Sequence, residues 1–254
     1  MHIALVPLLT EIKKPSSNMR RFADVLQVLV SKSTPDLVIL PECTFTGYLY
    51  EEEDLKQFAE PIPGPTTEHM AQLARQWCTS ICFGLVERAP DGVFNSAVLL
   101  DRDGETKLVH RKVSEKPPYA NGRRVGAVDT EFGKITVLIC GDLFQDEAIQ
   151  QVPPDTQLLV VPMARGFDKQ SPDSRRWEEE ERDVYLQAVE RVGVSTIVVN
   201  ALDVDVEEGS FGGGMVVDGH GNLLAETPHG TDKPLVYELQ TVRIAKFGSG
   251  QQEF

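Results

Sequence analysis

Short, wholly apolar segments alternate with longer amphipathic ones along this chain, and this alternation is what most constrains the fold. Residues 37–40 (LVIL, closed by Pro41) and 158–161 (LLVV) have no polar side, which is typical of strands buried on both faces of a sheet. In residues 19–30 and 70–77 the apolar side chains recur at helical spacing instead. Strands interleaved with covering helices predict an α/β core.

Two hairpins exclude a purely parallel sheet. Residues 93–100 and 106–110 flank the turn sequence DRDG, and residues 214–217 and 223–226 flank DGHGN, and both connectors are rich in residues that tight turns favour. Further strands are predicted at residues 1–6, 81–86, 135–140 and 195–199, helices at 146–151 and 177–192, and a loop at 117–126.

No Pro- or Ser-rich linker divides the chain, so a single domain is expected. The 254 residues are enough for one large α/β domain. The last segment, residues 241–254, is polar and weakly patterned. Two interpretations of it stay open: a disordered tail, or a tail that lies on a partner subunit.

Charge and cysteine content restrict the partners and the compartment. The chain has 39 acidic and 25 basic residues, a net charge of −14, which argues against a nucleic acid or an anionic membrane as the main partner. No apolar run approaches the roughly 20 residues of a membrane helix, and no signal segment precedes the first predicted strand. We therefore expect a cytoplasmic protein with reduced thiols, in which each of four cysteines is a packing residue, a ligand or a nucleophile: Cys43, Cys78, Cys82 and Cys140.

Three conspicuous features are better explained by structure than by chemistry. The acidic run 178–181 opens a predicted helix, where carboxylates complement the helix dipole on a solvated face. Cys78 and Cys82 lack the second ligand pair of a structural zinc site, so both are predicted to be buried. The glycine-rich residues 209–214 lack the Lys-Ser/Thr of a phosphate-binding loop, and we expect a loop that approaches another segment closely.

Three other segments place a reactive side chain directly beyond a predicted strand or hairpin, where α/β folds build their sites. They read LVILPECTFTGY with Glu42, HRKVSEK with Lys112, and ITVLICGDLFQDE with Cys140. In this order, and with these flanks, they resemble the carbon-nitrogen hydrolase family, or nitrilase superfamily, whose enzymes use a Glu-Lys-Cys triad. The stretches FNSAVLLDRDGETKLVHRK and GGGMVVDGHGNLLAE, and residues 177–200, are also similar to the family.

This resemblance covers residues 2 to about 240 and implies a fold and a reaction. The fold is a four-layer α-β-β-α sandwich in one domain, residues 1–240, which commonly assembles as a homodimer or a larger homo-oligomer. The reaction is hydrolysis of a small amide to a carboxylate and ammonia, with nitriles and N-carbamoyl compounds as alternative substrates. It requires neither metal nor organic cofactor, because the nucleophile, the base and the oxyanion donor are all protein groups.

The resemblance also implies roles for individual residues. Cys140 is the nucleophile, and because a free thiol with a pKa of about 8.5 is mostly protonated at neutral pH, Glu42 is needed as its base. Lys112 and the backbone N–H of Gly141 stabilise the oxyanion. Glu115 matches a second family glutamate, for which two interpretations stay open: a group that holds Lys112 or the substrate nitrogen, or a solvent-facing carboxylate.

Other residues near the triad receive supporting roles. Cys43 adjoins Glu42 but is expected to point to the opposite face and to serve in packing. Asp142 and Glu147 are predicted to fix the turn after Cys140 through hydrogen bonds to the backbone. Arg165 is the candidate for bidentate binding of a substrate carboxylate. The remaining candidates for the pocket wall are Tyr48, Tyr119, Phe144 and Met163.

Two hypotheses from other functional classes compete with that of an amide hydrolase. The first is a relative that keeps the fold but serves as a non-catalytic binding subunit. The second is a metal-dependent phosphohydrolase with Glu42 and Asp142 as ligands, in which Cys140 would be incidental.

Overall fold

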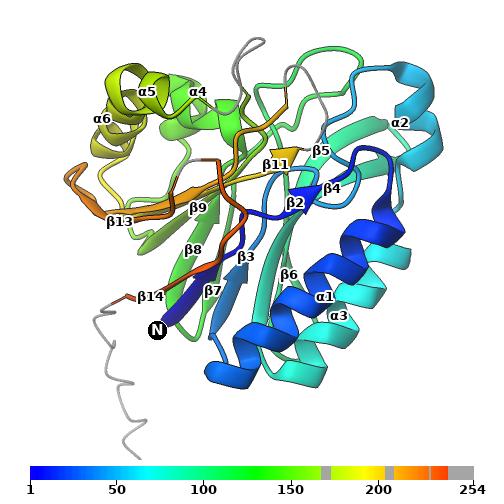
Figure 1. Ribbon diagram of the computed structural model, residues 1–254. Coiled ribbons are helices and arrows are strands. Elements are labelled where there is room, and N and C mark those ends of the chain that lie inside the picture. The colour runs from blue at the N-terminus through cyan, green and yellow to red at the C-terminus, as the bar shows by residue number, and fades with distance from the viewer. Residues whose placement is uncertain (167–172, 204–208, 229, 240–254) are drawn as a thin grey trace, which may run out of the picture.

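The computed structural model describes residues 1–166, 173–203, 209–228 and 230–239, and it contains two six-stranded sheets (Figure 1). The first sheet has the order β14 (Leu235–Glu238), β1 (His2–Leu5), β3 (Leu37–Ile39), β4 (Ser80–Ala89), β5 (Gly92–Leu100) and β6 (Thr106–Arg111). The second has the order β13 (Leu223–Glu226), β12 (Gly214–Val217), β10 (Thr196–Asn200), β9 (Leu158–Met163), β8 (Gly133–Val137) and β7 (Gly126–Thr130).

Both sheets are mixed, as the predicted hairpins require. In the first, β1, β3 and β4 are parallel, and β14, β5 and β6 are antiparallel to their neighbours. In the second, β8, β9 and β10 are parallel, and β7, β12 and β13 are antiparallel. Two further strands of two residues each, β2 (Leu9–Thr10) and β11 (Leu202–Asp203), form a separate parallel pair. β2 follows β1 of the first sheet along the chain, and β11 follows β10 of the second.

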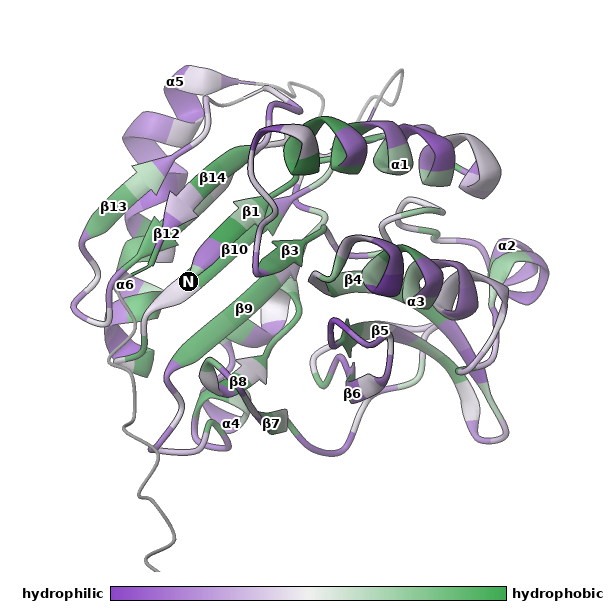
Figure 2. Cartoon of the chain, turned by 90° about the horizontal axis from the view of Figure 1, so that it is seen from below, coloured by the Kyte–Doolittle hydropathy of each residue, from purple (hydrophilic) through white to green (hydrophobic). Residues whose placement is uncertain are grey.

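Three apolar clusters hold four layers together, and they confirm the α-β-β-α sandwich. Side chains such as Leu5 and Ile39 of the first sheet meet Val137 and Val160 of the second in the central cluster. Helices α1 (Pro15–Lys32) and α3 (Pro65–Trp77) cover the outer face of the first sheet, and α6 (Arg182–Val192) covers that of the second. In Figure 2 both α1 and α3 carry hydrophobic and hydrophilic colours, whereas β1 and β9 are mainly hydrophobic.

The remaining helices are short and lie near the strand ends. They are α2 (Glu52–Phe58), the 3-10 helix η1 (Cys140–Phe144), α4 (Asp146–Ile149), α5 (Ser174–Arg176) and the π-helix η2 (Trp177–Glu181). Within the described ranges, no helix is long and apolar enough to cross a membrane.

Several boundaries differ from the sequence prediction. The strand expected at 135–140 ends at Val137, and the helix expected at 177–192 is divided into η2 and α6 and is preceded by α5. The predicted loop 117–126 gives way to β7 at its last residue. The predicted tail, residues 241–254, lies outside the described residues, so the domain boundary at 240 stays a prediction.

The glycine-rich loop packs as closely as expected. Gly212 has φ of +74°, and a Cβ there would lie 2.6 Å from the Thr231 carbonyl oxygen. The cysteines are only partly as predicted. Cys82 is buried in the central cluster, but Cys78 is exposed at the C-terminal end of α3, where it has φ of 50°.

Candidate active site

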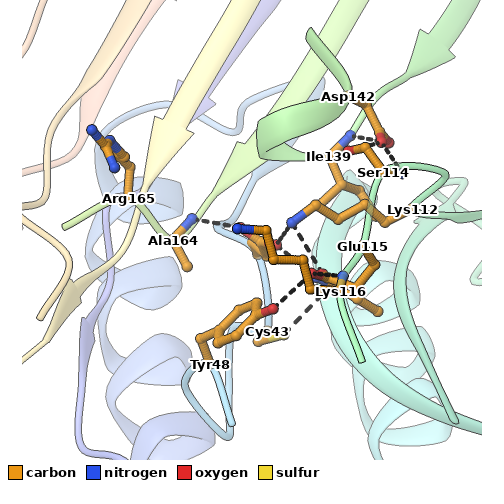
Figure 3. A network of polar contacts seen from close by, with 12 residues as sticks. Cys43, Tyr48, Lys112, Ser114, Glu115, Lys116, Ile139, Asp142, Ala164 and Arg165 are labelled. Atoms are coloured by element: carbon orange, nitrogen blue, oxygen red, sulfur yellow. Dashed lines mark hydrogen bonds and ion pairs between the residues drawn. The ribbon is translucent and has the colours of Figure 1, made fainter. Parts of the chain in front are cut away.

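The three segments singled out in the sequence meet at one end of the sandwich. Glu42 lies in the turn after β3, Lys112 directly follows β6, and Cys140 opens the 3-10 helix η1 that follows β8. Because β3 and β6 belong to the first sheet and β8 to the second, the site lies where the two sheets meet (Figure 3).

A turn that fits only against a glycine presents Glu42. Gly84 of β4 donates its N–H to the Pro41 carbonyl at 3.0 Å and accepts the N–H of Thr44 at 3.2 Å. A Cβ at Gly84 would collide with the backbone of Pro41 and Cys43. Cys43 has φ of 46°, a left-handed conformation that is uncommon for residues other than glycine. This bend leads the chain out of β3 and leaves Glu42 1% exposed.

Lys112 forms ion pairs with two buried carboxylates. Its Nζ lies 2.8 Å from Oε1 of Glu42 and 3.0 Å from Oε2 of Glu115, and the lysine side chain is 7% exposed. Burial disfavours the charged ammonium, but the negative charges of Glu42 and Glu115 outweigh burial and raise the pKa of Lys112. Lys112 therefore stays positively charged across the physiological range.

Asn95 of β5 connects the same two carboxylates, and sequence reasoning assigned it no role. Its Nδ2 donates to Oε1 of Glu42 at 2.6 Å and to Oε2 of Glu115 at 2.7 Å. Its carbonyl accepts the N–H of Lys112 at 2.9 Å, so the pairing of β5 with β6 sets it opposite the lysine. A polar residue inside a predicted buried strand was the available sequence signal, but only the structure shows that this residue contacts Glu42.

Glu115 is 8% exposed and lies inside the site rather than in solvent. Beyond its contacts with Lys112 and Asn95, its Oε1 accepts the hydroxyl of Tyr48 at 2.7 Å and the N–H of Lys116 at 2.9 Å. The carboxylate is therefore held on both oxygens. Of the two interpretations of Glu115, the structure places it where it holds Lys112.

Cys140 adjoins the base candidate. The Glu42 carboxylate, the Ala164 N–H and the Lys112 ammonium are all close enough to the thiol to affect its ionisation. Burial and the negative charge of Glu42 raise the pKa of Cys140 to about 12, although Lys112 and Ala164 favour the thiolate. The resting side chain is therefore a thiol. Its φ of 45° is a further left-handed outlier, of the kind that clusters at functional sites.

The other oxygen of Glu42 is also held. Its Oε2 accepts the N–H of Ala164, the first residue after β9, at 2.8 Å. Glu42 therefore contacts both sheets, with Asn95 and Lys112 on one side and Ala164 on the other. In Figure 3, Lys112, Glu115 and Ala164 lie around one common region of the site.

The residues after Cys140 differ in their surroundings. Gly141 lies against Ser114 and Lys112, since a Cβ there would be 3.2 Å from Oγ of Ser114 and 3.9 Å from Cε of Lys112. Asp142 is fully buried and accepts the N–H of Ile139 at 3.2 Å, which agrees with its predicted part in the turn. Glu147 is exposed on α4, so the prediction that its side chain fixes the turn is wrong.

Aromatic side chains form two groups around the site. Tyr48 packs on Tyr119 with ring centroids 5.5 Å apart, and its ring lies 5.7 Å from Nζ of Lys112. Cys43 is buried in the same cluster as Tyr119, and its thiol donates to Oδ1 of Asn95 at 3.6 Å. On the other side, Phe144 packs edge-on against Tyr185 of α6 at 5.1 Å.

The pocket candidates Met163, at the end of β9, and Arg165, two residues beyond it, behave differently. Met163 is 1% exposed and packs in the outer cluster of the second sheet, and its carbonyl accepts the N–H of Glu42 at 3.3 Å. Its backbone, rather than its side chain, therefore contributes to the site. The Arg165 side chain is 39% exposed, and its Nη2 lies 2.9 Å from Oε1 of Glu181.

That contact changes the interpretation of the acidic run. Residues 178–180 are exposed as predicted, but Glu181 is partly buried, accepts Arg165 and lies 3.6 Å from Arg176. Although burial disfavours the charged guanidinium, the hydrogen bond to Glu181 raises the pKa of Arg165. Arg165 is thus a charge-compensated arginine at the edge of the site.

A cavity of about 230 Å³ adjoins the site. Tyr48 and Ala164, which contact Glu115 and Glu42 respectively, form part of its wall. Lys13, Asp203 and Ser210 also line it.

The contacts of Glu42 and Asp142 argue against the hypothesis of a metal-dependent phosphohydrolase, in which these two residues would be metal ligands. Glu42 is already held by Lys112, Asn95 and Ala164, and the lysine ammonium occupies the space where a cation would bind. Asp142 is surrounded by N–H and O–H donors. Among the described residues, no group of three or more His, Cys, Asp or Glu side chains is arranged to hold a metal ion.

Sequence comparisons agree with the resemblance. A model of the carbon-nitrogen hydrolase family matches residues 4–248. A nitrilase of Pyrococcus abyssi is 30% identical over 199 residues, which cover 75% of this chain and 75% of the relative. The omega-amidase NIT3 of Saccharomyces cerevisiae is 24% identical over 269 residues, which cover 96% of this chain and 89% of the relative.

Solved structures show the same fold at lower identity. Nit3 of S. cerevisiae, a member of the nitrilase superfamily, has a TM-score of 0.80 at 20% identity, covering 100% of this chain and 97% of that one. The protein XC1258 of Xanthomonas campestris, of the CN-hydrolase superfamily, has a TM-score of 0.78 at 21% identity, covering 93% of this chain and 89% of that one. The sequence and fold together establish that the chain belongs to the carbon-nitrogen hydrolase family of the nitrilase superfamily.

Proposed function

We propose that this hydrolase cleaves a small linear amide through a thioester on Cys140, with Glu42 as the base and Lys112 as the oxyanion donor. One observation carries the proposal: Glu42 and Lys112 lie 2.8 Å apart and both adjoin the Cys140 thiol. A nucleophile, its base and a fixed positive charge are the groups that acyl transfer needs.

The first half-reaction forms the thioester. Glu42 takes the proton of the Cys140 thiol as the sulfur attacks the carbonyl carbon, which overcomes the raised pKa of the resting thiol. Lys112 and the N–H of Gly141 stabilise the negative oxygen of the tetrahedral intermediate. The C–N bond then breaks, and Glu42 passes the proton to the leaving nitrogen, so that ammonia departs neutral.

The second half-reaction releases the acid. Glu42 takes a proton from water, the hydroxide attacks the thioester carbonyl, and the same donors hold the oxyanion. The C–S bond breaks and the sulfur recovers the proton from Glu42. Glu115, fixed by Tyr48 and Asn95, keeps Lys112 in place throughout.

The relatives' names support an amide, since an (R)-stereoselective amidase of a Pseudomonas species and two omega-amidases are among them. Nitriles and N-carbamoyl compounds remain the alternative substrates of the same triad. The hypothesis of a non-catalytic subunit loses support because all three residues of the proposed triad are present and Glu42 and Lys112 form an ion pair.

Ammonia release from a panel of small amides, nitriles and N-carbamoyl compounds tests the proposal. We expect wild type to turn over an amide, Cys140→Ser to be inactive, and Cys78→Ser, which changes the exposed cysteine, to be unaffected. An acyl adduct should appear by intact mass on wild type but not on Cys140→Ser. A wild-type enzyme that hydrolyses nothing in the panel would favour the binding subunit instead.

For the assembly, we propose a homodimer or a larger homo-oligomer on the strength of the family resemblance. Light scattering coupled to gel filtration measures the mass against 28.2 kDa for one chain. A cytoplasmic location stays a prediction.

A further inference from the structure

A fully buried His–Asp pair lies beside the triad without being part of it. Nε2 of His110 is 3.0 Å from Oδ2 of Asp142, and both side chains are 0% exposed. His110 is in β6, two residues before Lys112, and Asp142 is in η1, two residues after Cys140. The pair therefore joins the first sheet to the second within two residues of both reactive groups.

Asp142 also holds the chain that follows Lys112. Its Oδ1 accepts the N–H of Val113 at 3.1 Å, the N–H of Ser114 at 2.9 Å and the hydroxyl of Ser114 at 2.7 Å. Its Oδ2 accepts the N–H of Ile139, the residue before Cys140, at 3.2 Å. In Figure 3, Asp142 lies between Ile139 on one side and Ser114 on the other.

The contacts of His110 define its protonation. The N–H of Gly126 donates to Nδ1 of His110 at 3.3 Å, so Nδ1 is an acceptor and the ring proton is on Nε2. The ring therefore donates to Asp142 from Nε2. This is a hydrogen-bonding role that a glutamine amide would reproduce and a leucine would not.

We propose that Asp142 and His110 are positioning residues that set the position of the Lys112 ammonium relative to the Cys140 sulfur. The inference rests on the proposed function, in which Lys112 must reach the oxyanion that forms on the carbon bonded to Cys140. Because the two groups come from different sheets, their separation depends on contacts that join the sheets at this point. An error of about 1 Å in such a geometry costs on the order of 100-fold in rate.

The test compares His110→Gln with His110→Leu, using the amide that wild type hydrolyses. We expect His110→Leu to lose about 10- to 100-fold in kcat with KM within about 3-fold, because placement of the oxyanion donor matters in the transition state. His110→Gln, which retains a donor to Asp142, should recover most of kcat. Equal kcat for wild type and His110→Leu would overturn the inference, as would equal losses in both variants.

A second variant keeps the test decisive where His110→Leu fails to fold. Ser114→Ala removes one of the donors to Asp142 at a partly exposed position, and we expect a smaller loss in kcat at unchanged KM and thermal stability. Loss of thermal stability at full kcat would show a purely structural pair. Failure of the proposed function is recognised separately, because wild type itself would then release no ammonia and form no adduct on Cys140.

Discussion

The ammonium of Lys112 lies 2.8 Å from the carboxylate of Glu42, although 70 positions separate the two residues in the chain. The turn after β3 and the end of β6 bring them together in a place where neither side chain is more than 7% exposed. A buried ion pair of this kind contributes little net stability on its own, but loss of either member leaves the other charge unpaired.

The first prediction concerns Lys112→Met. This change removes the proposed oxyanion donor and leaves Glu42 and Glu115 without their cation, so kcat should fall by about 100- to 1000-fold. The matched control is Lys107→Met, at the solvent-exposed opposite end of the same strand. Steady-state ammonia release measures both, and a Lys112→Met enzyme with wild-type kcat would contradict the assigned role.

The second prediction separates the hydrogen bonds that Asn95 donates from the effect of its being uncharged. Asn95→Ala removes both donors to the carboxylates and should cost about 1 to 3 kcal/mol in the free energy of unfolding. Asn95→Asp adds a buried negative charge as well, so its folded-state pKa should be raised and its extra penalty should grow with pH and disappear as pH falls. Urea unfolding of the two variants between pH 5 and 8 measures the difference, and a difference that does not change with pH would argue against this arrangement of charges.

The third prediction follows from the raised pKa of Cys140. Between pH 9.0, the ordinary pKa of the thiol, and about pH 12, its pKa in the folded protein, the unfolded thiol ionises but the folded one does not. The contribution of Cys140 to the free energy of unfolding is therefore complete below pH 9 and is lost as pH rises through this range. Cys140→Ser should lack this component, which amounts to about 1 kcal/mol at pH 10. Urea unfolding at pH 8 and pH 10 compares the two proteins, and parallel losses of stability would show that the thiol is not perturbed.

The fourth prediction concerns the substrate preference set by Arg165. If this side chain binds a substrate carboxylate, Arg165→Met should lower kcat/KM for glutaric acid monoamide about 10-fold while leaving pentanamide unchanged. Glu181→Gln frees the guanidinium from its partner and should shift preference toward the acidic amide. Arg175→Met, at an exposed arginine in α5, is the control, and an unaltered preference in all three variants would remove Arg165 from the specificity site.

The sequence predicted the elements with long or wholly apolar patterns and missed several short ones, among them α2, β7 and β14. The helices over 19–30 and 70–77 have enough turns for their periodicity to be recognised, as do the strands at 37–40 and 158–161. Strands β2 and β11, with two residues each, are too short to show any period, and tertiary pairing alone defines them.

The contacts that sequence reasoning missed are those decided by strand register and backbone geometry. Asn95 meets Glu42 because β5 pairs with β6, a relationship that no local pattern expresses. Glu181 turns toward Arg165 in a π-helical segment, where residues no longer follow the usual helical spacing. Cys140 adopts a left-handed conformation that only its tertiary surroundings make stable.

The division of the site between two sheets has a consequence for how the enzyme loses activity. Glu42, Asn95 and Lys112 come from the sheet that contains β1, whereas Cys140 and Ala164 come from the other, and the chain returns at β14 to complete the first sheet. Neither sheet alone therefore carries all the residues of the candidate active site. Any opening of the sandwich that separates the two sheets would therefore separate Cys140 from Glu42 and Lys112 before the individual sheets unravel, so the proposed ammonia release would report on the intact sandwich.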